Sequence, residues 1–339
     1  MEHFIYIKRW NKNFIYDKIL PIWLRTAIRI TIPILDIWWK ILLIIERKRK
    51  KWIKKKYYIA ICTIFKDEAM TIKEWIEYHK LIGVDHIYLY NNQSTDNYLD
   101  IITPYIKDNF ITLVNWNYPP PAQVSAYQHF RDNFWDETNW ITFIDIDEYL
   151  CPKRVLNLKD WLTKYENFPS LTIYWKMFGS SGILDFNTNK LLTEQFFIAW
   201  DKFCEIGKPI FNTRFNAIKS NIKYIHELPA VFTMGNMKFK IPPINEFKYF
   251  CSFRCNRLGI RKNKDDITLQ INHYATKSYN DFFVTRKKRG DVNNFANNSS
   301  VWSYVYIQQF SIQADYTIFR FIPFLKVRLS ENKIENFFD

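Results

Sequence analysis

Short apolar runs alternate with amphipathic stretches from residue 57 to residue 176. Runs rich in β-branched and aromatic residues predict buried strands, because a strand covered on both faces carries apolar side chains at nearly every position. The strands are expected at 57–65, 86–90, 110–116, 140–144 and 171–175. Apolar residues at helical spacing predict helices at 71–82, 98–107, 123–134 and 158–164. This alternation predicts an α/β fold with a mainly parallel central sheet.

The helix expected from residue 71 begins with Thr71-x-x-Glu74, which matches a capping box. His79 falls on the apolar face of the same helix, so we interpret it as a packed histidine and not as a ligand.

The pattern is less regular after residue 176. Mixed strands and loops are expected at 185–265, a strand at 267–272, a helix with a basic end at 277–290, and aromatic-rich helices at 301–329. We therefore divide the chain into three parts. These are a basic amphipathic segment at 1–56, an α/β domain at 57–290 and a C-terminal helical region at 291–339 that packs on the domain.

The strand expected at 140–144 ends in three acids, Asp145, Asp147 and Glu148. Because side chains alternate across a strand, Asp145 and Asp147 are expected to leave the sheet on the same side. Two carboxylates this close repel each other unless a cation lies between them. Because their ligand atoms are oxygens, the expected cation is Mg²⁺ or Mn²⁺. Ligands of open α/β sheets bind beyond the carboxyl ends of the strands. The alternative is a solvated turn, against which the surrounding apolar residues argue.

The net charge of +14 belongs mostly to one end of the chain. Residues 1–56 hold 15 Lys and Arg against 4 Asp and Glu, so this segment carries 15 − 4 = +11 and the rest carries 14 − 11 = +3. A protein that follows nucleic-acid phosphates needs positive charge along its body, so nucleic acid is not expected as a partner.

The stretch at 19–45 is rich in Ile, Leu and Trp but contains Arg25, Arg29, Asp36 and Lys40, which form one stripe on a helix. It predicts a helix that lies in the membrane interface, with Pro33 expected to kink or divide it. Eight basic residues at 46–56 would add attraction to anionic lipids. The alternative is a helix packed on the protein's own body beside a basic linker.

Five cysteines without regular spacing indicate free thiols in a reducing compartment. Basic residues interrupt the first twenty positions, which argues against a cleavable signal peptide. We therefore expect a cytoplasmic protein that associates peripherally with the inner face of the cell membrane.

Five motifs then follow in order. They are Cys62-Thr-Ile-Phe-Lys-Asp-Glu68 with Glu74-Trp-x-x-Tyr-His79, Ile87-Tyr-Leu-Tyr-Asn-Asn-Gln-Ser-Thr-Asp96, Phe143-Ile-Asp-Ile-Asp-Glu-Tyr149, Trp175-x-x-Phe-Gly-Ser-Ser-Gly182 and Asn272-His-Tyr-x-x-Lys-Ser278. Over about residues 57–330 the chain resembles the family-92 glycosyltransferases and their bacterial relatives close to family 2. The resemblance implies a GT-A fold, a nucleotide-sugar donor that is often a UDP-hexose, a divalent metal, and inversion at the anomeric carbon.

The resemblance also assigns roles to residues. Those that would cradle the nucleoside are Phe65, Lys66, Asp67, Asn92, Ser94 and Asp96. Asp145 and Asp147 would hold the ribose and the metal, and His273 would be a further metal ligand or a pyrophosphate contact. Lys277 and Arg289 would offset the diphosphate charge. One position departs from the family, because Asn91 stands where relatives commonly have Asp.

Inversion requires a carboxylate that deprotonates the acceptor hydroxyl. The candidates, unranked, are Asp185, Glu205 and Glu227. His226 is a motif position in the resemblance, with a structural role as an equal alternative. The small-residue loop of Gly179, Ser180, Ser181 and Gly182 permits close approach of a donor or acceptor.

The sequence thus predicts a metal-dependent, inverting glycosyltransferase that moves a hexose from a nucleotide sugar to a cell-surface glycan or a lipid-linked glycan. One alternative is a catalytically silent protein that binds nucleotide sugars or glycans. Another is a phosphoryl-transfer enzyme with Asp145 as the nucleophile, which is disfavoured because no Thr or Ser follows at the expected offset.

Overall fold

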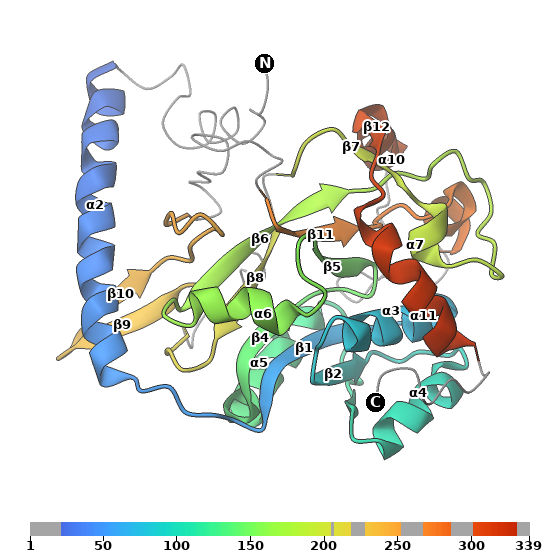
Figure 1. Cartoon of the computed structure of the whole chain (residues 1–339), viewed down its shortest axis with the longest axis horizontal. Coiled ribbons are helices and arrows are strands. Elements are labelled where there is room, and N and C mark those ends of the chain that lie inside the picture. The colour runs from blue at the N-terminus through green and yellow to red at the C-terminus, as the bar shows by residue number, and fades with distance from the viewer. Residues whose placement is uncertain (1–21, 205–206, 218–227, 252–266, 286–300, 331–339) are drawn as a thin grey trace.

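The computed structural model describes residues 22–204, 207–217, 228–251, 267–285 and 301–330. Within them, eight strands form one sheet in the order β3-β2-β1-β4-β8-β6-β11-β5 (Figure 1). The strands are β1 (Tyr57–Phe65), β2 (His86–Asn91), β3 (Ile111–Asn115), β4 (Thr138–Phe143), β5 (Glu148–Pro152), β6 (Ser170–Met177), β8 (Gly207–Asn212) and β11 (Leu269–His273).

Strands β1 to β4 pair in parallel, and β11 is parallel to β6. The antiparallel pairs are β4 with β8, β8 with β6 and β11 with β5. The expected α/β fold with a mainly parallel sheet is confirmed. The carboxyl ends of β1, β2 and β4 lie on one edge of the sheet, which places the loops that follow them near one another.

Helices connect and cover these strands. They are α3 (Ala69–Leu81), α4 (Tyr98–Lys107), α5 (Gln123–Asn133), α6 (Leu158–Leu162), α7 (Leu192–Gln195), α10 (Val301–Phe310) and α11 (Ile322–Leu329), with the short helices η2 (Trp135–Glu137), η3 (Thr163–Tyr165), η5 (Asp281–Thr285) and η6 (Thr317–Phe321). Two strand pairs lie outside the main sheet, namely β9 (Ala230–Met234) with β10 (Met237–Ile241), and β7 (Ile198–Trp200) with β12 (Ser311–Ala314). Helix α11 lies against α3 (Figure 1).

Helix α3 holds the strand that follows the acidic residues. The indole N–H of Trp75 donates to the carbonyl of Glu148 (2.8 Å), and the hydroxyl of Tyr78 donates to the carbonyl of Leu150 (2.9 Å). His79 is fully buried, which lowers its pKa to about 3, so it stays neutral at physiological pH. The interpretation of His79 as a packed histidine is confirmed.

The capping box expected at residues 71–74 is wrong. Helix α3 already begins at Ala69, whose N–H donates to the carboxylate of Asp96 at 2.7 Å. Glu74 instead points to α7, where its carboxylate accepts the first two backbone N–H groups at 2.6 and 3.0 Å. The first N–H groups of a helix lack partners within it, and here residues distant in sequence supply the acceptors.

Helix α2 (Ile22–Arg49) is continuous across Pro33, so of the two expected effects, a kink or a division, the division is wrong. A proline removes one backbone hydrogen bond, but the turns on either side continue. None of the helices in the described ranges is both long enough and apolar enough to cross a bilayer.

The C-terminal half of α2 packs on the body of the protein, as the alternative interpretation of this segment proposed. Leu42 and Leu43 are buried in the main hydrophobic core. The rings of Trp39 and Phe250 lie 5.5 Å apart, and the guanidinium of Arg47 donates to a backbone carbonyl at 2.6 Å. The helix therefore has an inner face that belongs to the fold.

Candidate active site

Asp145 and Asp147 lie on a tight turn and not on an extended strand. Strand β4 ends at Phe143, β5 begins at Glu148, and the N–H of Glu148 donates to the carbonyl of Asp145 at 3.0 Å. The argument from strand alternation therefore does not apply to the two aspartates, because alternation holds only while the chain stays extended.

The carboxylate of Asp145 has two strong partners. Its Oδ2 lies 2.9 Å from the ammonium of Lys208 on β8, and its Oδ1 accepts the side-chain N–H of Gln123 on α5 at 3.0 Å. Lys208 is fully buried. Burial alone would lower its pKa, but the carboxylates of Asp145 and Glu148 raise it to about 12. The structure thus gives Asp145 protein partners where the sequence suggested a metal.

Glu148 is a third, fully buried carboxyl beside this pair. Its Oε2 accepts the backbone N–H of Asp145 at 3.0 Å and lies 3.5 Å from the Lys208 ammonium. Its Oε1 is buried without a hydrogen-bond partner among the described residues. Burial raises the pKa of Glu148 well above its usual value, while Lys208 opposes the shift.

Asp147 faces a different neighbourhood. Its Oδ1 is buried, has no hydrogen-bond partner among the described residues and lies 3.7 Å from Nε2 of His273. The same imidazole nitrogen lies 4.0 Å from Oε1 of Glu148. Oδ1 of Asp147 and Oε1 of Glu148, both without a hydrogen-bond partner among the described residues, thus lie near the imidazole of His273 where β5 and β11 pair.

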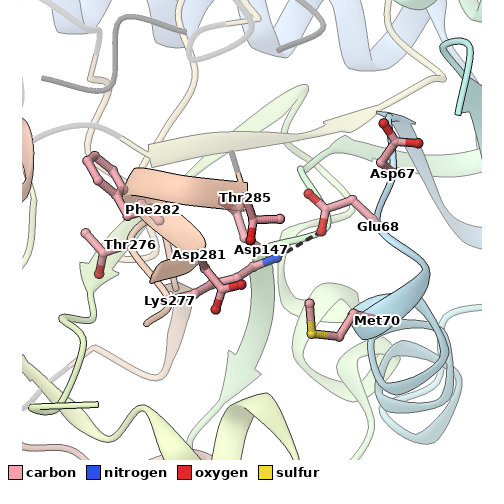
Figure 2. Close-up of a pocket in the computed structure, with 10 residues that line it drawn as sticks. Asp67, Glu68, Met70, Asp147, Thr276, Lys277, Asp281, Phe282 and Thr285 are labelled. Atoms are coloured by element: carbon pink, nitrogen blue, oxygen red, sulfur yellow. Dashed lines mark hydrogen bonds and ion pairs between the residues drawn. The ribbon is translucent and has the colours of Figure 1, made fainter. Parts of the chain in front are cut away.

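A surface hollow opens in front of Asp147, and Figure 2 shows its lining. The residues are Asp67, Glu68, Met70, Asp147, Ala275, Thr276, Lys277, Asp281, Phe282 and Thr285. Three residues assigned to nucleotide-sugar or metal binding, namely Asp67, Asp147 and Lys277, therefore meet here from three separate segments. The ammonium of Lys277 is 2.8 Å from the carboxylate of Glu68, so its charge is already partly balanced.

The part of the chain that the structure describes contains no group of three or more His, Cys, Asp or Glu side chains arranged to hold a metal ion. The orphaned Oδ1 of Asp147 nevertheless fits a Mg²⁺ or Mn²⁺ ion that arrives with a donor diphosphate, because such ions commonly use one or two carboxylates together with substrate phosphates. Asp145, in contrast, is occupied by Lys208 and Gln123.

The two loops assigned to the nucleoside are tied to each other. The N–H of Asp67 donates to the hydroxyl of Ser94 at 2.9 Å, and the N–H of Thr95 donates to the carboxylate of Asp67 at 2.6 Å. Asp96 accepts the first N–H of α3. These side chains hold the shape of the edge beyond β1 and β2.

Other residues assigned to the nucleoside differ in exposure. Phe65 and Asn92 are buried, and the amide of Asn92 donates to two backbone carbonyls in the loop after β3. Lys66 is half-buried. Asn91, the position that departs from the family, donates to the hydroxyl of Tyr98 at 2.7 Å, so the amide has a structural role here.

The small-residue loop is packed against α10. The backbone N–H of Ser180 donates to the side chain of Gln308 at 3.1 Å, and the hydroxyl of Ser181 accepts two N–H groups of the 197–198 segment at 3.0 Å. A side chain at Gly179 would collide with Gln308 at 2.6 Å, whereas Gly182 is open and has a φ of +76°. Glycine is therefore favoured at 179 because a side chain would collide with Gln308, and at 182 because of the positive φ.

Among the candidate bases, Asp185 is exposed and accepts the amide of Asn280 at 2.6 Å, but it does not line the hollow. Glu205, His226, Glu227 and Arg289 lie outside the described residues. Asp281, which the sequence reasoning did not select, lines the hollow and accepts the hydroxyl of Ser278 at 2.6 Å.

Sequence reasoning also missed Gln123 and Lys208. The signal for Lys208 is a lysine at the start of the apolar run 209–211, since a lysine buried in a strand requires a carboxylate partner. Its partner could not be read from the sequence, because the two residues are 63 positions apart.

A family model described as Glycosyltransferase family 92 matches residues 55–282, which is more than half of the chain. The chain is 29% identical over 142 residues to a glycosyltransferase family 92 protein of Oryza sativa subsp. japonica and 30% identical over 135 residues to one of Ricinus communis. These alignments cover 41% and 38% of this chain and 24% of each relative. The chain therefore matches only about a quarter of the length of these relatives.

Solved structures show a partial likeness. TarS of S. aureus in complex with UDP is 15% identical, with a TM-score of 0.29 over 46% of this chain and 47% of that chain. Glucosyl-3-phosphoglycerate synthase of Mycobacterium tuberculosis in complex with Mn²⁺, UDP and glucosyl-3-phosphoglycerate is 14% identical, with a TM-score of 0.26 over 35% and 44%.

Proposed function

Because the chain belongs to glycosyltransferase family 92, we propose that it transfers a hexose, with inversion, from a nucleotide sugar, most simply a UDP-sugar, to a glycan acceptor. The observation that carries the proposal is the hollow beside Asp147. Nine of its ten lining residues fall inside the matched range 55–282. They come from the loop after β1 and the first turn of α3, from the acidic turn at 145–148 and from the segment after β11.

Different residues of the site would bind different parts of the nucleotide-sugar donor. Asp147, with His273 beside it, would hold Mn²⁺ or Mg²⁺, which when bound supplies positive charge to a departing diphosphate. Lys277 can exchange its contact with Glu68 for a phosphate oxygen, since both are anionic oxygens. Asp145, fixed by Lys208, would accept a hydrogen bond from the ribose. The metal and Lys277 would thus place positive charge beside the diphosphate, and Asp145 would orient the ribose.

Inversion needs a base on the acceptor side. Asp185, Glu205 and Glu227 remain candidates, and Asp281 joins them because its carboxylate already faces the hollow. The base would take the proton of the acceptor hydroxyl as the bond to the anomeric carbon forms.

The test is release of nucleoside diphosphate from a panel of UDP-sugars, with and without Mn²⁺. Asp147→Asn is expected to lower turnover by about 10²-fold or more, because it removes the carboxylate charge that would hold the metal ion. Asp108→Asn is the matched control, since Asp108 is an exposed aspartate at the opposite edge of the sheet. Unchanged turnover in Asp147→Asn would remove the metal role, and donor binding without turnover would indicate the silent alternative.

We propose further that the protein lies on the cytoplasmic face of the cell membrane, where a lipid-linked or cell-surface glycan precursor would meet the site. Support comes from the exposed basic residues of 46–56, among them Lys48, Lys51 and Lys54, and from the exposed apolar side chains on the described part of α2. Co-sedimentation of the whole chain with anionic vesicles tests this, and indifference to lipid charge would contradict it.

A further inference from the structure

From residue 34 onward, the outer face of α2 is apolar and exposed. Ile34, Ile37, Trp38, Ile41 and Ile44 recur at spacings of three and four, so they form one stripe along the helix. The inner face, described above, points the opposite way into the core. An exposed apolar stripe of this length on one helix is uncommon on the surface of a soluble domain.

The β9–β10 hairpin extends this stripe. Met234 and Met237 face each other across the hairpin and are 45% and 54% exposed. Residues two apart on a strand share a face, so Met237 points to the same side as Phe239, whose ring lies 5.7 Å from that of Trp38. The methionine pair therefore stands on the side of the hairpin that meets α2.

The hairpin is held to the end of the helix. The guanidinium of Arg49 donates to the carbonyl of Thr233 at 2.9 Å and lies 4.8 Å from the ring centre of Phe232. Figure 1 shows α2 along one side of the molecule with the hairpin reaching to it, away from α4 and α11. The two elements thus present one surface.

The charge around this surface is positive. Lys40 and Lys48 on α2 and Lys238 and Lys240 on β10 are exposed. Residues 230–241 contain no acid, and the acids at 34–50 are Asp36 and Glu46, half-buried and buried respectively. Apolar side chains with lysines around them suit a membrane surface, because the apolar groups can enter the acyl region while the lysines contact anionic headgroups.

We propose that the hairpin tip is a second membrane contact, and that Met234 and Met237 insert beside the outer stripe of α2 into an anionic lipid surface. This rests on the membrane attachment proposed above. A single helix lying in the interface leaves the protein free to roll about the helix axis. A second contact off that axis fixes the roll and so sets the direction in which the hollow beside Asp147 faces.

The experiment compares partitioning of the full-length protein onto vesicles of phosphatidylcholine alone and with phosphatidylserine. Met234→Ser/Met237→Ser and Ile37→Ser/Ile41→Ser are each expected to weaken partitioning onto anionic vesicles by about tenfold or more, since each removes two inserting apolar side chains. Leu99→Ser/Leu156→Ser is the matched control, because these leucines are equally exposed on other parts of the surface.

The outcomes separate the two proposals. Loss in both test variants, with the control unchanged, supports the second contact. Loss in the α2 variant alone would leave membrane attachment in place and overturn the role of the hairpin. Loss in neither would overturn both. If the methionine variant changed the oligomeric state in solution and left partitioning unchanged, the surface would be an interface between copies of the chain, and the proposal would be wrong.

Discussion

The ammonium of Lys208 lies 2.9 Å from the carboxylate of Asp145, inside the fold and at the start of the acidic turn. The same ammonium is 3.5 Å from Glu148, so one buried cation balances two of the three acids. Asp147 is left as the acid that faces the hollow. The protein therefore supplies part of the positive charge that the sequence suggested a metal would provide.

Lys208→Met is expected to lower the free energy of unfolding by about 3–5 kcal/mol, because it leaves buried carboxylates without their cation. Lys208→Arg keeps the charge and should lose less. Urea denaturation measures both. Equal losses in the two variants would show that the side-chain shape at this position matters and the charge does not.

The loss of unfolding free energy in Lys208→Met should be smaller at acidic pH than at alkaline pH. Burial holds the pKa of Glu148 above its usual value, and removing Lys208 takes away the charge that opposes this shift. The folded variant then binds a proton at Glu148 more readily than the unfolded chain does, so acidification toward pH 5 favours folding. The difference in unfolding free energy between Lys208→Met and the unaltered protein should therefore become smaller as the pH falls from 8 to 5. A difference that stays constant would contradict the role of Lys208 in opposing the raised pKa of Glu148.

Gly207→Ala should disturb the same site through the backbone. A Cβ at this position would lie 1.8 Å from the carbonyl of Ile173 on β6, so the two strands would have to separate next to Lys208. We expect a loss of about 3 kcal/mol or more together with reduced turnover. Gly235→Ala is the control, because its Cβ meets nothing, its φ of +58° costs about 1–2 kcal/mol, and it lies in the β9–β10 turn and does not line the hollow.

Glu74 should behave as a helix cap held by tertiary structure. Glu74→Ala leaves two buried N–H groups of α7 and the hydroxyl of Thr193 without their acceptor, which we expect to cost about 2–4 kcal/mol. Glu74→Gln keeps one acceptor oxygen and should cost less. Thermal unfolding of the two variants measures the difference, and similar melting temperatures would rule out capping.

The two faces of α2 predict opposite results for neighbouring residues. Leu43→Ala removes a buried side chain and should cost about 2–5 kcal/mol, whereas Ile44→Ala removes an exposed one and should change stability by less than about 0.5 kcal/mol. Denaturation in urea distinguishes them. A small effect at Leu43 would mean that α2 is not part of the folded core.

Strand β5 (Glu148–Pro152) of the main sheet was not predicted from the sequence, but the other sheet strands and the α-helices of residues 57–177 were. Their apolar runs match the structure to within a few residues, as for α4 at 98–107, because each element depends mostly on side chains within it. The burial of His79 and the α/β class followed for the same reason. Family motifs also pointed to three residues of the hollow, namely Asp67, Asp147 and Lys277.

Only the tertiary structure decided which polar groups meet. The sequence shows Asp145, Glu74 and Asp96 as acids but does not show that Lys208 neutralises the first, or that the other two cap helices α7 and α3. Those partners lie from 27 to 119 positions away. Hydrogen bonds and ion pairs act over a few ångströms in space, so they are fixed by how strands and helices pack, whereas the periodicity that forms each element is local to the chain.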